Sequence, residues 1–178
     1  MPSLPVHIEI AKKINNNDDF ILGSILPDIC IFKDINHKIT HYNNPKKIAI
    51  DLFLNDYKNK LNNPIIQGYL VHLLTDIYFN SYAHKHYTLN ENNWVIKQND
   101  FNLYGNNFNN KIKISDKTLI YIKDLPFITK KDIYTMIDKV NNLKKYDSTY
   151  KMFNKNELDI VFNECIIYIK KYLKNNLN

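Results

Sequence analysis

The stretch from residue 64 to residue 82, PIIQGYLVHLLTDIYFNSY, most constrains how this chain can fold. It is apolar almost all the way round a helix, and such a helix belongs at the centre of a protein rather than on its surface. His72 and Asp76 lie four residues apart within it, so both side chains project from one face. Gly68, one turn earlier, leaves room for another backbone or a ligand, and Asn80 lies one turn later. The rest of the chain must pack around this helix.

The polar pair inside this helix needs a partner. An unpaired buried carboxylate is too costly to keep ionised, and a metal ion is one partner that the pair could share. A hydrogen bond between His72 and Asp76, or from each to nearby backbone, is the alternative. A membrane span is a further interpretation of a helix of this length. The polar residues within the helix argue against a span, because they would be costly in lipid.

Composition and the residues that start and end helices predict one all-α domain over residues 1–178. Hydrophobic residues make up 44% of the chain and charged residues 24%, as in ordinary soluble proteins. With three glycines, few alternating runs and no glycine-rich phosphate loop, we expect a bundle of about six or seven helices around the central one. The expected helices cover about 4–14, 20–26, 45–59, 64–82, 94–108, 129–143 and 156–173. Residues 111–127 could form short strands or a helix.

The charged residues and the cysteines limit which partners and which cellular compartment we expect for this chain. All cationic residues are lysines, with a net charge of +6, which suits a phosphate-bearing substrate or weak attraction to an anionic membrane or nucleic acid. The absence of arginine argues against a site dedicated to recognising phosphate groups or nucleic-acid bases, because bidentate recognition favours arginine. Cys30 and Cys165 have no CxxC spacing and are expected to be buried thiols in a reducing compartment. The first residues do not form a secretory leader, so we expect a cytoplasmic protein.

Histidines and aspartates that face inward recur along four successive segments of the first half of the chain. They are His7, Asp28, His41, His72 and Asp76. Structural histidines rarely come with two carboxylates directed at the same place. A mixed set of imidazoles and carboxylates suits zinc, manganese or iron and contains too much nitrogen for calcium or magnesium. Asp100 is a further candidate acid, with a helix cap or a surface group as the alternative.

The order and setting of these residues resemble the zinc-dependent phospholipase C family, which is related to single-strand-specific nucleases of the same all-helical fold. After His7 come LGSILPD, which ends at Asp28, then THY with His41, then GYLVHLLTD with His72 and Asp76. The HxxxD motif in its GYLxHLLTDxY setting is the most specific part. The resemblance covers about the first half of the chain and is closest to short, unsecreted bacterial members.

This resemblance implies a set of roles. Asp28, His41, His72 and Asp76 would form one complete metal site. His7 would hold part of a second site, with Asp76 as the bridging carboxylate. The implied activity is phosphodiester hydrolysis by a metal-activated water, on a phospholipid head group or a nucleotide, with Asp28 as general base as well as ligand.

The chain departs from the secreted enzymes of this family at several positions. Those enzymes bind metal through a processed N-terminal tryptophan, whereas this chain begins Met-Pro. They hold a third ion through a histidine after the HxxxD motif and a later HxxxE pair. Here Tyr82 stands at the place of that histidine, His84 and His86 follow slightly later, and no HxxxE follows. We therefore expect one or two ions, zinc first, with manganese or iron as alternatives.

Two other functions stay open from the sequence. A nuclease or nucleotidase of the same fold could stack bases on aromatic side chains, although most aromatics at helical spacing belong to the core. The available aromatics are Tyr42, Tyr78, Tyr82, Trp94 and Tyr104. A non-catalytic protein could use Asp28, His41, His72 and Asp76 as a closed, structural metal site. Core histidines with no metal remain as the last interpretation.

Overall fold

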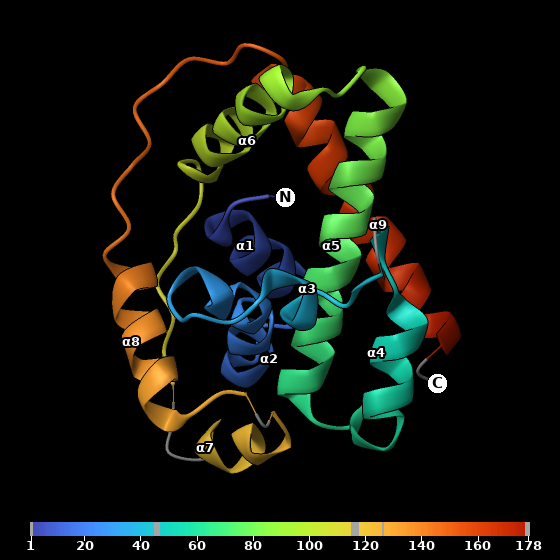
Figure 1. The fold of residues 1–178 in the computed structure, drawn as a ribbon, viewed down its shortest axis with the longest axis vertical. Helices are drawn as coiled ribbons and strands as arrows, with labels where there is room; N and C mark the ends of the chain where they lie inside the picture. Colours follow the sequence, from blue (N-terminus) through green and yellow to red (C-terminus); the bar gives the residue numbers. More distant parts are fainter. Residues whose placement is uncertain (1, 45–46, 115–117, 126, 177–178) are drawn as a thin grey trace.

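The computed structural model describes residues 2–44, 47–114, 118–125 and 127–176, and this part of the chain is predominantly helical (Figure 1). The longer α-helices are α1 (Leu4–Ile14), α4 (Ile50–Tyr57), α5 (Pro64–His86), α6 (Glu91–Gly105), α8 (Lys130–Asn141) and α9 (Lys155–Asn176). The shorter ones are α2 (Asp18–Gly23), α3 (His37–Thr40) and α7 (Thr118–Tyr121), with 3-10 helices η1 (Leu26–Ile31), η2 (Lys58–Lys60) and η3 (Ile122–Asp124). Strands β1 (Asn43–Asn44) and β2 (Lys47–Ile48) form one antiparallel pair. The all-α prediction is confirmed.

Helix α5 is the central helix that its sequence predicts. Figure 1 shows it in the middle of the molecule, with α1 and α2 on one side and α4 and α9 on the other. It begins where Asn63 accepts a hydrogen bond from the backbone N–H of Ile65 at 2.9 Å and Pro64 occupies the first turn. It continues four residues beyond Tyr82, to His86. Within the described residues, no helix combines the length and the apolar character that crossing a membrane requires.

Helix α2 lies directly against α5, backbone on backbone. A Cβ atom at Gly68 would overlap the carbonyl oxygen of Phe20, and one at Gly23 would overlap the carbonyl oxygen of Ile65. Glycine is required at both positions because no side chain fits between the two backbones. The space that the sequence predicts beside Gly68 is therefore filled by the backbone of α2.

Several predicted helix boundaries are wrong, and the helix expected over 94–108, for example, covers Glu91–Gly105. The helix expected over 45–59 begins only at Ile50, because residues 43–44 and 47–48 pair as a hairpin and the N–H of Ala49 donates to the carbonyl of Tyr42 at 2.9 Å. Its expected first residue, Pro45, lies outside the described residues. The helix expected over 20–26 ends at Gly23, and the chain continues as the 3-10 helix η1, whose first turn contains Pro27. A proline has no N–H to continue the α-helical pattern.

A buried carboxylate, that of Asp100, holds the connection between α8 and α9 against α6. Asp100 accepts hydrogen bonds from the backbone N–H groups of Lys151, Met152 and Phe153, at 3.0, 2.7 and 2.9 Å. These residues belong to the long connection from α8 to α9, which runs past α6 in Figure 1. The candidate acid Asp100 is therefore a structural anchor.

The backbone contact between α2 and α5 predicts a large difference between two glycine substitutions. Gly68→Ala is expected to lower the free energy of unfolding by about 1–3 kcal/mol, because the added methyl group must separate packed backbones. Gly105→Ala is the matched control. At Gly105 a Cβ meets mainly the side chain of Ser3, which can rotate away. Urea unfolding of both variants measures the difference, and equal stabilities would contradict the contact.

Candidate metal centre

Five side chains from four parts of the fold meet in the core. His7 comes from α1, Asp28 from η1, His41 from the residue after α3, and His72 and Asp76 from α5. All five are buried, and Asp28 is the most accessible at 3%. The structure thus brings together every residue that the sequence nominates for the metal site. Within the described residues, three groups of these and neighbouring side chains are close enough to hold a metal ion: His7–Asp28–His72, His41–His72–Asp76 and Cys30–His37–His41.

Two of the imidazoles are oriented by hydrogen bonds on their outer nitrogens. His72 Nδ1 lies 2.8 Å from the carbonyl oxygen of Ser24, the residue that ends α2, so Nδ1 donates and Nε2 carries the lone pair. Thr40 donates its hydroxyl to the carbonyl of His37, and its Oγ1 lies 2.9 Å from Nδ1 of His41. With the hydroxyl donating to His37, Nδ1 of His41 would donate to Oγ1 and leave Nε2 as an acceptor. The two Nε2 atoms lie 3.2 Å apart, so a proton or a cation is needed between them.

The carboxylates face the same point without forming hydrogen bonds. Oδ2 of Asp76 lies 3.4 Å from Nε2 of His72 and 3.7 Å from Nε2 of His41, while Oδ1 lies 3.4 Å from Nε2 of His7. Oδ1 of Asp28 lies 3.4 Å from Nε2 of His41. Within the described residues, both oxygens of Asp76, Oδ1 of Asp28 and both nitrogens of His7 lack a hydrogen-bond partner. Buried polar groups in proteins are normally satisfied, so this concentration indicates a missing partner.

The carboxylates and imidazoles of the cluster are electrostatically coupled. Burial alone would raise the pKa of Asp76 and of Asp28, but the neighbouring imidazoles outweigh it, so the pKa of Asp76 falls well below its ordinary value and that of Asp28 is also lowered. Burial lowers the pKa of His72, but the two carboxylates outweigh it and the pKa is raised. Burial and the His72 ring lower the pKa of His7. Two carboxylates thus lie among three buried imidazoles.

The spacing of the donor atoms fits a small transition metal. Two nitrogen ligands at about 2.0–2.1 Å from a tetrahedral zinc ion lie about 3.3 Å from each other. The donor atoms of His41, His72, Asp76 and Asp28 lie 3.2 to 3.7 Å from their neighbours. Nitrogen and carboxylate oxygen together suit zinc, manganese or iron. The residues present therefore fit a metal ion.

The ring orientations differ between the pairs of imidazoles in the cluster. The lone pair of an imidazole nitrogen lies in the plane of its ring, so a bound metal lies close to that plane. The rings of His7 and His72 are stacked, 3.8 Å apart and within 9° of parallel, and their planes do not meet at a common ion. The rings of His41 and His72 are inclined by 66°, and their planes do meet. The group His41–His72–Asp76 therefore has the better-oriented imidazoles, whereas Asp28 is grouped with His7 and His72 within the described residues.

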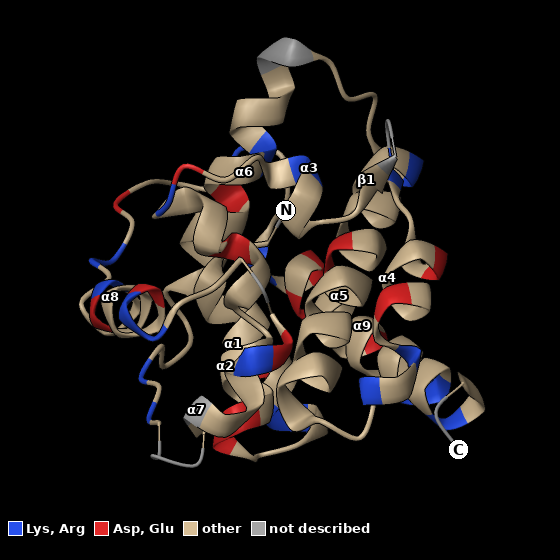
Figure 2. Ribbon diagram, turned by 60° about the horizontal axis from the view of Figure 1, so that its bottom comes forward, with Lys and Arg blue, Asp and Glu red and all other residues tan. Residues whose placement is uncertain are grey.

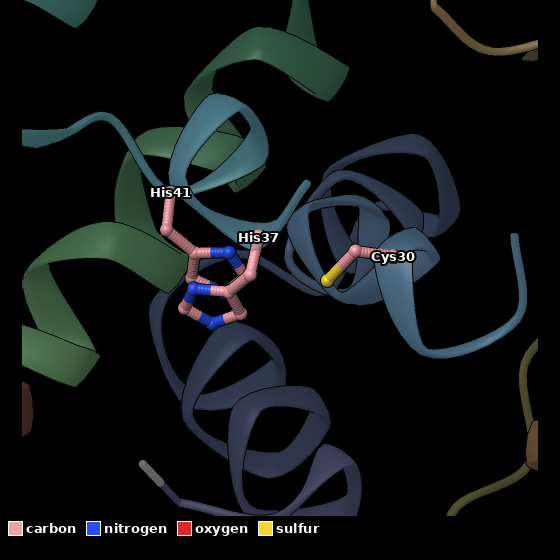
Figure 3. A group of neighbouring side chains, drawn as sticks. All are labelled: Cys30, His37 and His41. Atoms are coloured by element: carbon pink, nitrogen blue, oxygen red, sulfur yellow. The ribbon is translucent and has the colours of Figure 1, made fainter. Parts of the chain in front are cut away.

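The third group, Cys30, His37 and His41, is less suited to hold an ion in this arrangement. Figure 3 shows the rings of His37 and His41 one over the other, with the sulfur of Cys30 directed towards them. The two rings are 3.7 Å apart and within 10° of parallel, so their nitrogens also lack a common in-plane point. His37 instead contacts the side-chain amide of Asn43 at 3.2 Å, and the thiol of Cys30 donates to the carbonyl of Pro27. Cys30 is half-buried and Cys165 is buried.

A cleft of about 760 Å³ reaches the cluster at Asp28. Its walls come from the first residues of the chain, η1, α5, α6 and the connection after α8, and include Leu4, Ile31, Phe32, Asn80, Trp94, Lys97, Leu143, Lys144 and Tyr146. Among the five aromatics that the sequence offers for base stacking, Trp94 alone lines this cleft, and Tyr104 is buried in the core. The cleft joins the buried donors to the surface.

The sequence missed Lys97, which is buried in the wall of this cleft. Nothing in the periodicity of residues 94–104 separates this lysine from a solvated one. His84 and His86 lie on the exposed end of α5, and His86 stacks on Tyr82. Neither belongs to a metal-binding group within the described residues.

No protein-family model matches the chain, and comparisons with curated proteins and with solved structures give no match. The resemblance to zinc-dependent phospholipase C therefore stays a prediction that depends on His7, Asp28, His41 and the HxxxD pair.

Metal content is the first test of this centre. Protein purified without a metal-binding tag is expected to contain about one to two equivalents of zinc, manganese or iron. His72→Ala should lose most of this metal, because it removes a nitrogen held in place by Ser24. The exposed His84→Ala should keep it. Equal metal content in the two variants, or no metal in the reconstituted wild type, would contradict the site.

A bound ion also predicts a reversal in the effect of one substitution on stability. Zinc should raise the melting temperature of the wild type but not of Asp76→Asn, since the variant loses the carboxylate donor of the His41–His72–Asp76 group. After chelation, Asp76→Asn should be at least as stable as the wild type, because it removes an unsatisfied buried charge. Asp147→Asn, at an exposed position, is the control and should follow the wild type in both conditions. A wild type that melts at the same temperature with and without zinc would argue against metal binding.

Proposed function

We propose that this protein is a metal-dependent phosphodiester hydrolase of the phospholipase C type. One observation carries this proposal: Asp28 belongs both to the buried cluster of imidazoles and carboxylates and to the wall of the cleft. A substrate in the cleft would therefore meet the donor set directly. A purely structural metal site has no need of a cleft that ends on one of its ligands.

The residues of the chain have distinct roles in this proposal. A divalent ion, when bound, supplies a Lewis acid that polarises a phosphoryl oxygen and favours ionisation of water. The pKa of Asp28 is lowered, by His72 and His41 against the effect of burial, so this carboxylate is ionised at neutral pH and can accept a proton at the floor of the cleft. Ser24 and Thr40 hold the imidazoles of His72 and His41 in orientation.

The walls of the cleft favour a phospholipid over a nucleotide. Leu4, Ile31, Phe32 and Leu143 give the cleft an apolar lining next to the polar floor at Asp28. Ile31 is 62% exposed and Leu143 41% exposed, so apolar side chains continue to the rim. An amphipathic phosphodiester matches this pattern of a charged end and an apolar wall. A nucleotide remains the second candidate, with Trp94 as the side chain on which a base would stack.

The distribution of lysines supports weak rather than specific contact with an anionic surface. Figure 2 shows the lysines spread over separate parts of the molecule, including α8 and the C-terminal part of α9. Acidic residues lie among them on α8 and α9. We therefore propose only a weak attraction to anionic membranes or nucleic acids, which salt would screen.

Hydrolysis is tested with three substrates: a chromogenic bis-nitrophenyl phosphodiester, a short-chain phosphatidylcholine and a single-stranded oligonucleotide. The metal-loaded protein should hydrolyse the phosphatidylcholine with the highest kcat/KM. Asp28→Asn should lower kcat by about 10²-fold or more, because it removes the proton acceptor at the cleft floor.

Asp34→Asn, at an exposed position on the segment after η1, is the control for this variant. It should leave kcat unchanged. Stoichiometric metal without turnover of any of the three substrates would instead support the non-catalytic, structural site.

A further inference from the structure

Lys97 is a buried cation without a carboxylate partner. Its exposed fraction is 2%, and no ion pair links it to an aspartate or glutamate of the described residues. Its Nζ donates to Oδ1 of Asn80 at 3.1 Å and lies 5.8 Å from the ring centres of both Trp94 and Phe101. An ammonium group has three donors, and one neutral amide satisfies only one of them. Burial lowers the pKa of Lys97, and the negative charge of Asp76 acts in the opposite direction.

The position of this lysine connects it to the metal centre. Asn80, which holds the ammonium, lies one turn after Asp76 on α5. Lys97, Asn80, Trp94 and His37 line the cleft that ends at Asp28 and also a second cleft, of about 960 Å³, beside it. A ligand in either space therefore meets the same ammonium group.

Lys97 differs from every other lysine along these two clefts. Lys38, Lys47 and Lys144 are exposed, and water already solvates their charges. A charge removed from water is costly unless an opposite charge meets it. The nearby carboxylates, Asp28 and Asp76, face the imidazoles and would repel a phosphate anion that entered the cleft. A buried cation in the wall of the same cleft as Asp28 would offset this repulsion.

We propose that Lys97 is an anion-binding residue of the cleft whose ammonium group contacts a non-bridging phosphoryl oxygen of the ligand. The identity of that ligand as a substrate rests on the proposed function, but the binding of a phosphate group by Lys97 does not. Asn80 positions the ammonium, and the faces of Trp94 and Phe101 favour its charged form. If the protein is a hydrolase, Lys97 is a catalytic residue, because charge develops on the same phosphoryl oxygens during the reaction.

Inorganic phosphate is the probe, titrated by calorimetry into protein with zinc and into protein treated with a chelator. Lys97→Met keeps the length of the side chain and removes its charge, so it should weaken phosphate binding about tenfold or more, as expected for a charge-assisted hydrogen bond. Lys97→Gln keeps a donor for Asn80 and should show the same loss. Lys144→Met makes the same substitution at an exposed lysine of the same cleft and should bind phosphate within about twofold of the wild type.

The metal content of each variant separates this inference from the proposed function. Unchanged metal content together with weakened phosphate binding in Lys97→Met and Lys97→Gln supports the inference that Lys97 binds the anion. Equal phosphate affinity in these two variants and the wild type overturns it and leaves the hydrolase proposal standing. Phosphate binding that depends on Lys97 in a protein that never takes up metal supports it while the hydrolase proposal fails. Loss of metal in both folded Lys97 variants overturns it, because Lys97 would then act on the metal centre.

Discussion

The contact between the backbones of α2 and α5 sets the geometry on which the polar centre depends. Gly23 and Gly68 allow the two helices to touch without intervening side chains. This approach brings the carbonyl of Ser24, at the end of α2, to 2.8 Å from Nδ1 of His72. The helix end supplies a carbonyl with no partner inside its own helix, and the imidazole supplies the donor. The tautomer of His72, and with it the direction of its lone pair, is therefore fixed by how closely two helices pack.

The centre itself is unfavourable without a partner. Two ionised carboxylates and an imidazole with no hydrogen bond lie in an interior that is otherwise built from apolar side chains. A fold optimised only for stability would place leucine or phenylalanine at these positions. Groups that violate the ordinary rules of burial cluster at functional sites, and here they converge within the distances of a coordination shell. The unsatisfied atoms and the spacing thus point to the same explanation, a bound cation.

The sequence predicts the central helix and its inward donors well, because a helix that is buried on all sides has apolar residues almost all the way round. Helix α5 begins at the residue expected, and the space beside Gly68 is filled by backbone. The start of α4 was not predictable from the helix signal at residue 44, because pairing with β1 depends on a neighbouring segment. Lys97 was missed, and the role of Asp100 was left open between a functional acid and a cap or surface group, for a related reason. Periodicity reports which side of a helix is buried, whereas their roles depend on Asn80 and on residues 151–153, which lie far from them in the chain or on another element.

The positions of the donors along the chain have a consequence for biosynthesis. Every member of the polar cluster lies between His7 and Asp76, whereas Lys97 and Leu143 of the cleft wall follow later. A ribosome therefore completes the whole donor set before it has translated the helix that carries the buried lysine. Until α6 and the connection after α8 are made, the growing chain holds its imidazoles and carboxylates without the wall that later separates them from solvent. The timing of translation thus leaves an interval in which the donors are complete but the wall of the cleft does not yet cover them.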